Sequence, residues 1–296
     1  MTDPAAPPWF TAALAAPRRE GRVDSGGCPI NFLEWGEAAC PGLVFVHGGA
    51  AHAHWWSFLA PLLADQWHAA ALDLSGHGDS GRREAYSLEA WVDEVMTVAE
   101  RAAFPGPPVV VGHSMGGLIA IQAASDHGDR LAGVVLVDAP LRRPDPESQE
   151  GSRTRAFRAP GIYPTREAAV GRFRLIPEQP VLHPFLFEHV AGHSVREVPG
   201  GWTWKFDPAV FLRPRPPMGE RLAGVRCHLA LIHGEHSAVV PPDIAAYTAE
   251  MMGPQAPVVP LPGAYHHLLL DQPLAFVAAL RTLLLAWGHT GPLRTG

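Results

Sequence analysis

The sequence predicts an α/β fold: a mostly parallel, twisted sheet flanked by helices, with an inserted helical cap. Two observations predict the sheet. Short, almost continuously apolar runs recur along the chain, and segments with helical patterns separate them. A third observation predicts the cap, because this alternation stops over residues 141–218, which are rich in proline, arginine and aromatic residues. With 47% hydrophobic residues among 296, the chain can fill a large core.

The individual elements follow from these patterns. The runs that we expect to form strands are 43–47, 68–73, 108–111, 133–138, 228–233 and 256–260. The segments that we expect to be helical are 55–63, 87–103, 115–126, 243–252 and 274–286. Residues 20–23 and 30–35, around the Gly26–Gly27 turn, are expected to form an antiparallel hairpin at the sheet edge.

The chain is expected to divide into a core and a cap. The core comprises residues 1–140 and 219–296, and the cap comprises 141–218. Within the cap, residues 165–175 and 185–191 form amphipathic pieces that we expect to be helical. The alternative of a disordered linker fits poorly, because the segment holds too many aromatic residues for a solvated tether.

Composition excludes several functional classes. A net charge of −6 and a pI near 6.2 argue against nucleic acid or an anionic membrane as the main partner. No apolar stretch reaches the ~18 residues of a spanning helix, and the N-terminus lacks the basic region of a signal peptide. Three cysteines without C-x-x-C spacing indicate neither a disulfide framework nor a zinc site. We therefore expect a cytoplasmic protein.

Sixteen histidines raise the question of a metal site. They cluster at His52 and His54 and again at His266 and His267. The segments expected to be helical contain no H-x-x-x-H or H-E-x-x-H pair, which is the spacing that places two ligands on one helical face. We therefore expect no metal site and no organic cofactor.

The most informative motif is VVVGHSMGG at residues 109–117. An expected strand runs directly into Gly112-His113-Ser114-Met115-Gly116, and an expected helix follows. In this context G-x-S-x-G is a nucleophile elbow, a sharp turn that needs small residues around the serine. It exposes the serine hydroxyl at the N-terminus of a helix, where negative charge is favoured. Ser114 is therefore the predicted nucleophile.

With this motif the chain resembles the α/β-hydrolase superfamily over residues 20–287. Three more segments carry the resemblance. They are VFVHGGAAHAHWW at 44–56, LDLSGHGDS at 72–80 and LPGAYHHLLLDQP at 261–273. The resemblance implies a serine hydrolase with a catalytic histidine on a C-terminal loop. His266 matches that position better than the adjacent His267, and it is the predicted general base.

The acid of the triad departs from the usual pattern of the superfamily. The position after the strand at 228–233, where an aspartate is usual, is occupied by Ser237. The superfamily also uses an acid at the end of the strand that follows the elbow helix, and Asp138 stands there. We expect Asp138 to orient His266, with Glu235 as the alternative.

The resemblance also implies an oxyanion hole and a substrate pocket. The backbone N–H groups of Met115 and of Gly49, with Ala50 as its near alternative, are expected to stabilise the oxyanion. Five aromatic residues are candidates for an apolar pocket that binds a hydrophobic substrate. They are Trp55, Trp56, Trp202, Trp204 and Phe206.

The predicted activity is hydrolysis of a carboxylic ester, lactone or thioester of a hydrophobic small molecule through an acyl-enzyme on Ser114. Serine at the elbow argues against epoxide hydrolases and haloalkane dehalogenases, whose relatives need aspartate there. A C–C bond hydrolase or a perhydrolase is the alternative on this fold. A non-catalytic ligand-binding relative is a third hypothesis, because Ser237 replaces the usual acid.

Overall fold

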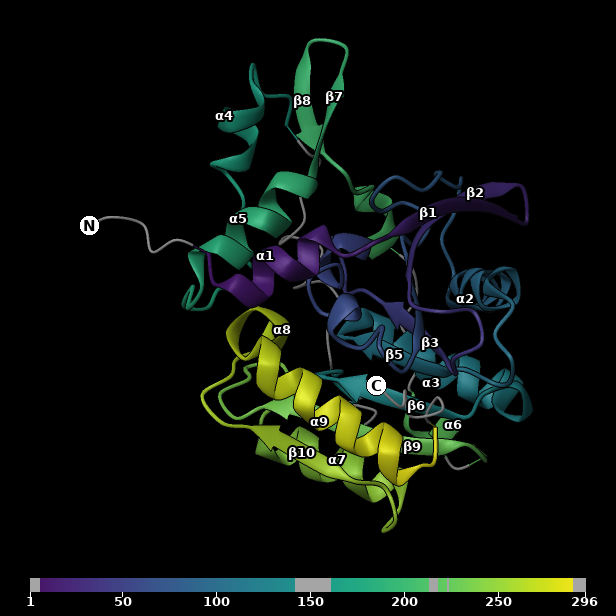
Figure 1. Ribbon diagram of the computed structural model, residues 1–296. Helices are drawn as coiled ribbons and strands as arrows, with labels where there is room; N and C mark the ends of the chain where they lie inside the picture. The colour runs from purple at the N-terminus through teal and green to yellow at the C-terminus, as the bar shows by residue number, and fades with distance from the viewer. Residues whose placement is uncertain (1–5, 142–160, 213–217, 223, 290–296) are drawn as a thin grey trace.

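The architecture is a twisted eight-stranded sheet between two layers of helices. We describe a computed structural model over residues 6–141, 161–212, 218–222 and 224–289. The strands of the sheet are β1 (Arg19–Ser25), β2 (Cys28–Trp35), β3 (Gly42–Val46), β4 (His68–Leu72), β5 (Val109–His113), β6 (Gly133–Val137), β9 (His228–Gly234) and β10 (Val258–Leu261). Their order is β1-β2-β4-β3-β5-β6-β9-β10. Strand β2 pairs antiparallel with both β1 and β4, and all other pairs are parallel (Figure 1). The predicted fold class is confirmed.

Helices cover both faces of this sheet, because its central strands are apolar on both sides. One face packs against α2 (Leu88–Ala102), α3 (Met115–His127) and α7 (Pro242–Met252). The other face packs against α1 (Pro8–Ala15) and α9 (Pro273–Ala286). Local signals fix the helix ends as expected, since the Ser87 side chain caps α2 by accepting a hydrogen bond from the Ala90 amide at 3.1 Å.

The helix expected over residues 55–63 was wrong. The structure has two 3-10 turns there, η1 (Ala53–Trp55) and η2 (Ala60–Leu62). Pro61 provides the physical reason, because proline lacks the N–H that an α-helix needs and its ring clashes with the preceding turn. The N-terminal helix α1 was not predicted.

The segment between β6 and β9 forms a separate layer, except that its last element, α6, packs against α3 and α7 (Figure 1). Its described elements are α4 (Arg166–Val170), α5 (Pro184–His193), β7 (Val195–Val198), β8 (Gly201–Trp204), η5 (Pro208–Phe211) and α6 (Gly219–Leu222). Besides the expected helices, the described part of the predicted cap contains an antiparallel hairpin, formed by β7 and β8, that projects from the molecule (Figure 1). Glycines with positive φ at 200 and 201 permit its turn, and β-prone residues fill its strands.

Residues 142–160 and 213–217, at the two ends of the predicted cap, lie outside the described residues. The boundaries at 140 and 219 therefore stay a prediction. Figure 1 shows α5 lying beside α1, and the Phe10 and Phe185 ring centroids are 4.9 Å apart. Within the described part of the chain, no helix is both long and apolar enough to cross a membrane.

Candidate active site

The serine lies at the sharp turn between β5 and α3. Ser114 has φ 52° and ψ −115°, a strained conformation for a residue other than glycine. The residues two positions before and after Ser114 have no room for a side chain. A Cβ on Gly112 would lie 2.3 Å from the Gly116 carbonyl oxygen, and a Cβ on Gly116 would lie 2.4 Å from that of Val46. The packed backbones therefore hold the strained turn, and Ser114 remains partly exposed.

Asp138 and His266 form a buried pair. The Asp138 Oδ2 atom lies 2.6 Å from His266 Nδ1, and the two side chains are 0% and 4% exposed. Asp138 follows β6 with φ 46°, which turns its side chain out of the sheet direction. A carboxylate at this distance fixes the imidazole tautomer with the proton on Nδ1, which leaves Nε2 to act as a base.

Ser237 and Gly234 bind the same carboxylate. The Ser237 hydroxyl donates to Asp138 Oδ2 at 2.6 Å, and the Gly234 amide donates to Oδ1 at 2.9 Å. The Ser237 Oγ atom also accepts hydrogen bonds from the amides of Val239 and Val240. The serine at the usual acid position thus supports an acid that comes from a different strand.

Of the two alternative residues, Glu235 makes other contacts, whereas the His267 ring lies beside that of His266, with centroids 4.8 Å apart. Glu235 is exposed, and its Oε2 accepts a hydrogen bond from the Gly263 amide at 2.9 Å and lies 3.8 Å from His236 Nε2. The His267 ring packs against Trp55 and His113, with centroids 5.3 and 5.7 Å apart. Burial, above all, lowers the pKa of His267 well below its ordinary value.

Two contacts that sequence reasoning missed hold the histidine loop. The buried His113 Nε2 lies 3.0 Å from the His266 carbonyl oxygen, which can only accept, so Nε2 carries the proton. Burial and the neighbouring His266 lower the pKa of His113 to about 3, so its ring stays neutral.

From the cap side, Gln179 Oε1 accepts a hydrogen bond from the His267 amide at 2.9 Å. The Gln179 Nε2 atom donates to both oxygens of Asp271, and Asp271 Oδ2 accepts from the Tyr265 amide at 2.8 Å. The backbone on both sides of His266 is therefore fixed. Gln179 lies 87 positions from His266 in sequence, and no local pattern marks it.

The loop after β3 lies against the elbow. A Cβ on Gly48 would lie 3.3 Å from the Ser114 Cβ, and one on Gly49 would lie 3.9 Å from Met115 Sδ. His47 shapes this loop: its Nε2 accepts from the Leu74 amide at 3.0 Å, so its Nδ1 carries the proton and donates to the Gly48 carbonyl at 2.7 Å. Gly49 and Met115 are thus on neighbouring segments, as an oxyanion hole requires.

The structure separates the five aromatic residues proposed for the pocket. Trp55 is near the site, since its ring faces His113 and His267. Trp56 is fully buried in the core, stacked 4.8 Å from Phe45, which corrects its assignment to the pocket.

Trp202 and Trp204 belong to the β7–β8 hairpin. The Trp204 ring packs within the cap against Tyr163 and Phe173, at 6.2 and 6.0 Å. Phe206 lies 6.2 Å from Phe211, a residue that the sequence did not single out. Phe211 covers the oxyanion loop, because a Cβ on Gly49 would lie 2.9 Å from its ring.

Comparison with known proteins agrees with this geometry. The chain is similar to the esterase Rv0045c of Mycobacterium tuberculosis, with 27% identity over 269 residues, covering 89% of this chain and 88% of that protein. It is also similar to the pimeloyl-[acyl-carrier protein] methyl ester esterase of Chromobacterium violaceum, with 28% identity over 248 residues, covering 81% and 92%. Among solved structures, the thioesterase domain from the curacin biosynthetic pathway superposes with a TM-score of 0.75 at 26% identity, covering 91% of this chain and 99% of that domain.

The model of the alpha/beta hydrolase family matches residues 43–280, which contain the elbow, Asp138 and the histidine loop. This match spans most of the chain, and the sheet order and strand directions agree with it. The chain therefore belongs to the α/β-hydrolase family.

Proposed function

We propose that this enzyme hydrolyses carboxylic esters of hydrophobic small molecules through an acyl-enzyme on Ser114. The contact between Asp138 Oδ2 and His266 Nδ1 carries the proposal, because it supplies an oriented base on the loop next to the elbow. The esterase relatives support ester hydrolysis as the reaction. Both are esterases by name, and one is named as a methyl ester esterase.

The first half of the reaction forms the acyl-enzyme. His266 Nε2 takes the proton of the Ser114 hydroxyl as Oγ attacks the ester carbonyl. The negative charge that develops on the carbonyl oxygen is stabilised by the N–H groups of Gly49 and Met115, each worth about 3 kcal/mol. The protonated imidazole, held by Asp138, then gives its proton to the leaving alkoxide.

The second half regenerates the enzyme. A water molecule gives a proton to His266 Nε2 and attacks the acyl carbonyl. The tetrahedral intermediate then collapses, the protonated imidazole gives its proton to Ser114 Oγ, and the carboxylic acid leaves. The buried carboxylate stays ionised throughout and only stabilises the imidazolium. Apart from this water, the groups that act in these steps belong to the chain itself.

The environment of the elbow favours an apolar substrate. Two aromatic side chains lie near the elbow: Trp55 faces His113, and Phe211 lies against Gly49. Both are largely buried aromatic side chains, and such surfaces bind acyl chains or rings better than sugars or phosphates. We therefore place a hydrophobic acyl or alcohol group there.

Hydrolysis of p-nitrophenyl esters with acyl chains of increasing length tests this function. Wild type is expected to turn over these esters with a preference for one chain length, and Ser114→Ala is expected to lose at least about 10³-fold in kcat. Rapid quenching followed by intact-mass analysis should find the acyl group on wild type alone. Turnover that survives in Ser114→Ala, or an acyl group on another residue, would refute the proposal.

A further inference from the structure

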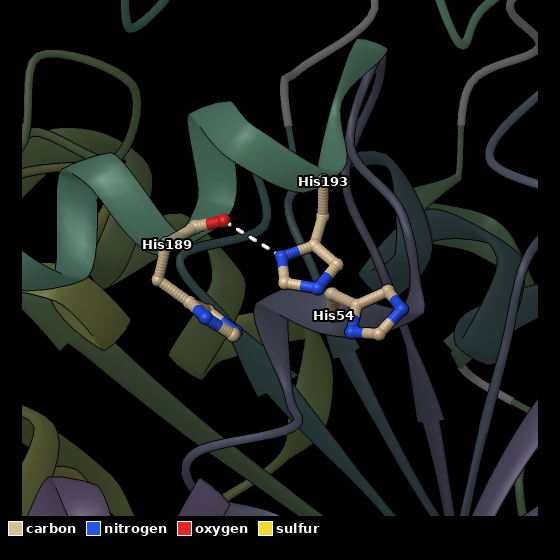
Figure 2. A group of neighbouring side chains, drawn as sticks. All are labelled: His54, His189 and His193. Carbon is tan, nitrogen blue, oxygen red and sulfur yellow. Dashed lines mark hydrogen bonds between the residues drawn. The ribbon is translucent and has the colours of Figure 1, made fainter. Parts of the chain in front are cut away.

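Three histidines from two separate parts of the chain meet where the cap contacts the core. His189 and His193 lie one turn apart on α5, and His54 lies on η1, shortly after the oxyanion loop. One ring nitrogen of each lies within 4.8 Å of the other two (Figure 2). The sequence prediction missed the H-x-x-x-H pair because the expected helix ended at Ala191, whereas α5 continues to His193.

Hydrogen bonds use only part of the capacity of these rings. His193 Nδ1 donates to the His189 carbonyl oxygen at 2.9 Å, as Figure 2 shows. His189 Nε2 lies 2.8 Å from the Ser57 hydroxyl. This leaves His193 Nε2 and His189 Nδ1 to act as ligands. Metal-binding imidazoles are usually oriented in this way, by a hydrogen bond on the ring nitrogen that does not bind the metal.

The Nδ1 atom of His54 is the strongest evidence for a ligand at this cluster. This nitrogen is buried and has no hydrogen-bond partner in the structure. An unsatisfied buried nitrogen is costly, so such an atom calls for an explanation. The His54 ring stacks on His193 with centroids 3.9 Å apart, so the two rings lie side by side and must rotate before their in-plane lone pairs can converge on one ion.

The donor set selects the type of ion. Three imidazoles and no carboxylate suit Zn²⁺ and other divalent transition metals, whereas Mg²⁺ and Ca²⁺ require oxygen ligands. Burial lowers the pKa of His54 to about 2 and that of His189 to about 3, so both rings are neutral and keep their lone pairs at pH 7. Nitrogens around tetrahedral Zn²⁺ lie about 3.3 Å apart, so small ring rotations would close the site.

The charges around the cluster limit the affinity but do not exclude a cation. The cationic groups acting on the three rings are Arg18, Arg166 and Lys205. Lys205 Nζ is 2.6 Å from Asp79 Oδ2, so its charge is paired, and Arg18 is exposed to water. Arg166 donates to the Gly192 carbonyl oxygen.

We propose that His54, His189 and His193 bind one divalent transition-metal ion and that this ion fastens cap helix α5 to the η1 segment of the core. The fourth position of the tetrahedron would hold water. Because η1 follows the loop that carries Gly49, the ion fixes the cap close to the oxyanion loop. The site is separate from Ser114, and the proposal does not depend on the reaction catalysed.

Titration of the metal-free full-length protein with Co²⁺ tests the site, because tetrahedral Co²⁺ has intense visible absorption. One Co²⁺ per chain is expected to bind with this spectrum and to be displaced by Zn²⁺. His193→Gln is expected to weaken binding roughly 100-fold. Saturating Zn²⁺, at about 100 times Kd, should raise the Tm of wild type by about 5 °C but not that of His193→Gln.

Two variants make the outcome specific. His183→Gln removes a histidine just before α5 and should bind Co²⁺ as wild type does. His267→Gln removes a member of the second histidine cluster, formed with His113 and His266, and should also bind normally. Loss of binding in His267→Gln with retention in His193→Gln would overturn the proposal, and so would the absence of tetrahedral Co²⁺ at millimolar concentration.

Discussion

At the scale of single residues, the carboxylate of Asp138 has three neighbours that define its state. His266 Nδ1, the Ser237 hydroxyl and the Gly234 amide all lie 2.6 to 2.9 Å from its two oxygens. All three donate hydrogen bonds, so they fix the orientation of the carboxylate. The serine that replaces the usual acid is thus part of the arrangement that holds the carboxylate.

Replacement of Ser237 by alanine tests this role. Ser237→Ala removes one donor to a buried carboxylate and is expected to lower kcat about tenfold with little change in KM, because the imidazole is held less firmly. Steady-state kinetics on a p-nitrophenyl ester measure the effect. An unchanged kcat in a folded variant would show that the serine is only a loop residue.

The sequence favoured Asp138 over Glu235 as the candidate for the orienting acid, and the structure brings Asp138 within 2.6 Å of His266. The serine at 237 removed the usual candidate, and an aspartate at the end of β6 was the remaining position known in the superfamily. The hydrogen bond between the two residues was not predictable, because it joins positions 99 apart through the fold. The same holds for the contact of Gln179 with the histidine loop.

At the scale of elements, the crossing of β5 and α3 depends on glycine. Gly112→Ala would place a methyl group 2.3 Å from the Gly116 carbonyl oxygen, so the strand and helix must move apart. We expect a loss of about 3 kcal/mol in the free energy of unfolding. Gly106→Ala is the control, because nothing lies within 4 Å of its Cβ, and its change should stay within about 1 kcal/mol. Urea unfolding measures both variants. Equal free energies of unfolding for Gly112→Ala and Gly106→Ala would contradict this account.

The contact of the cap with the histidine loop makes a second prediction at this scale. Gln179→Leu removes the acceptor of the His267 amide and the donor to Asp271, so the loop carrying His266 is held less firmly. We expect kcat to fall about tenfold while KM and Tm change little. The exposed neighbour Glu178 offers a control, since Glu178→Gln should be as active as wild type. Equal kcat values for both variants would exclude a positioning role.

Elements were predictable where one pattern dominated. The six parallel strands are apolar on both faces, and the capped helix α2 has a clear N-terminal signal. The predictions from sequence failed where a local pattern competed with proline geometry or with contacts between distant residues. Pro61 broke an apparently helical segment, and the Asp73 carboxylate holds the start of η1 through the Ala53 amide at 2.7 Å. The tryptophans in the cap hairpin looked like pocket residues because aromatic side chains serve both roles.

At the scale of the whole molecule, buried neutral histidines make stability depend on pH. Burial lowers the pKa of His47 to about 4 and that of His113 to about 3, against 6.5 when exposed. Between these values the unfolded chain binds more protons, so stability falls as the pH is lowered below about 6.5. Each histidine is expected to cost about 2 kcal/mol between pH 7 and pH 5.

A buried carboxyl opposes this trend in part. Burial raises the pKa of Asp73 to about 6, so the folded state binds the extra proton below that pH and gains stability. The net result is still a fall, because two histidines outweigh one carboxyl. Urea unfolding at pH 7, 6 and 5 measures it, and a free energy of unfolding that is constant or rises toward pH 5 would contradict the neutral state of these histidines.

The central claim is that Asp138, and not Glu235, orients His266. Measuring kcat/KM for Asp138→Asn and Glu235→Gln on one p-nitrophenyl ester tests this claim most directly. The account predicts a fall of roughly 10³- to 10⁴-fold for Asp138→Asn, because an amide cannot hold the imidazolium, and wild-type activity for Glu235→Gln. Activity that survives in Asp138→Asn and is lost in Glu235→Gln would contradict it and assign the orienting acid to Glu235.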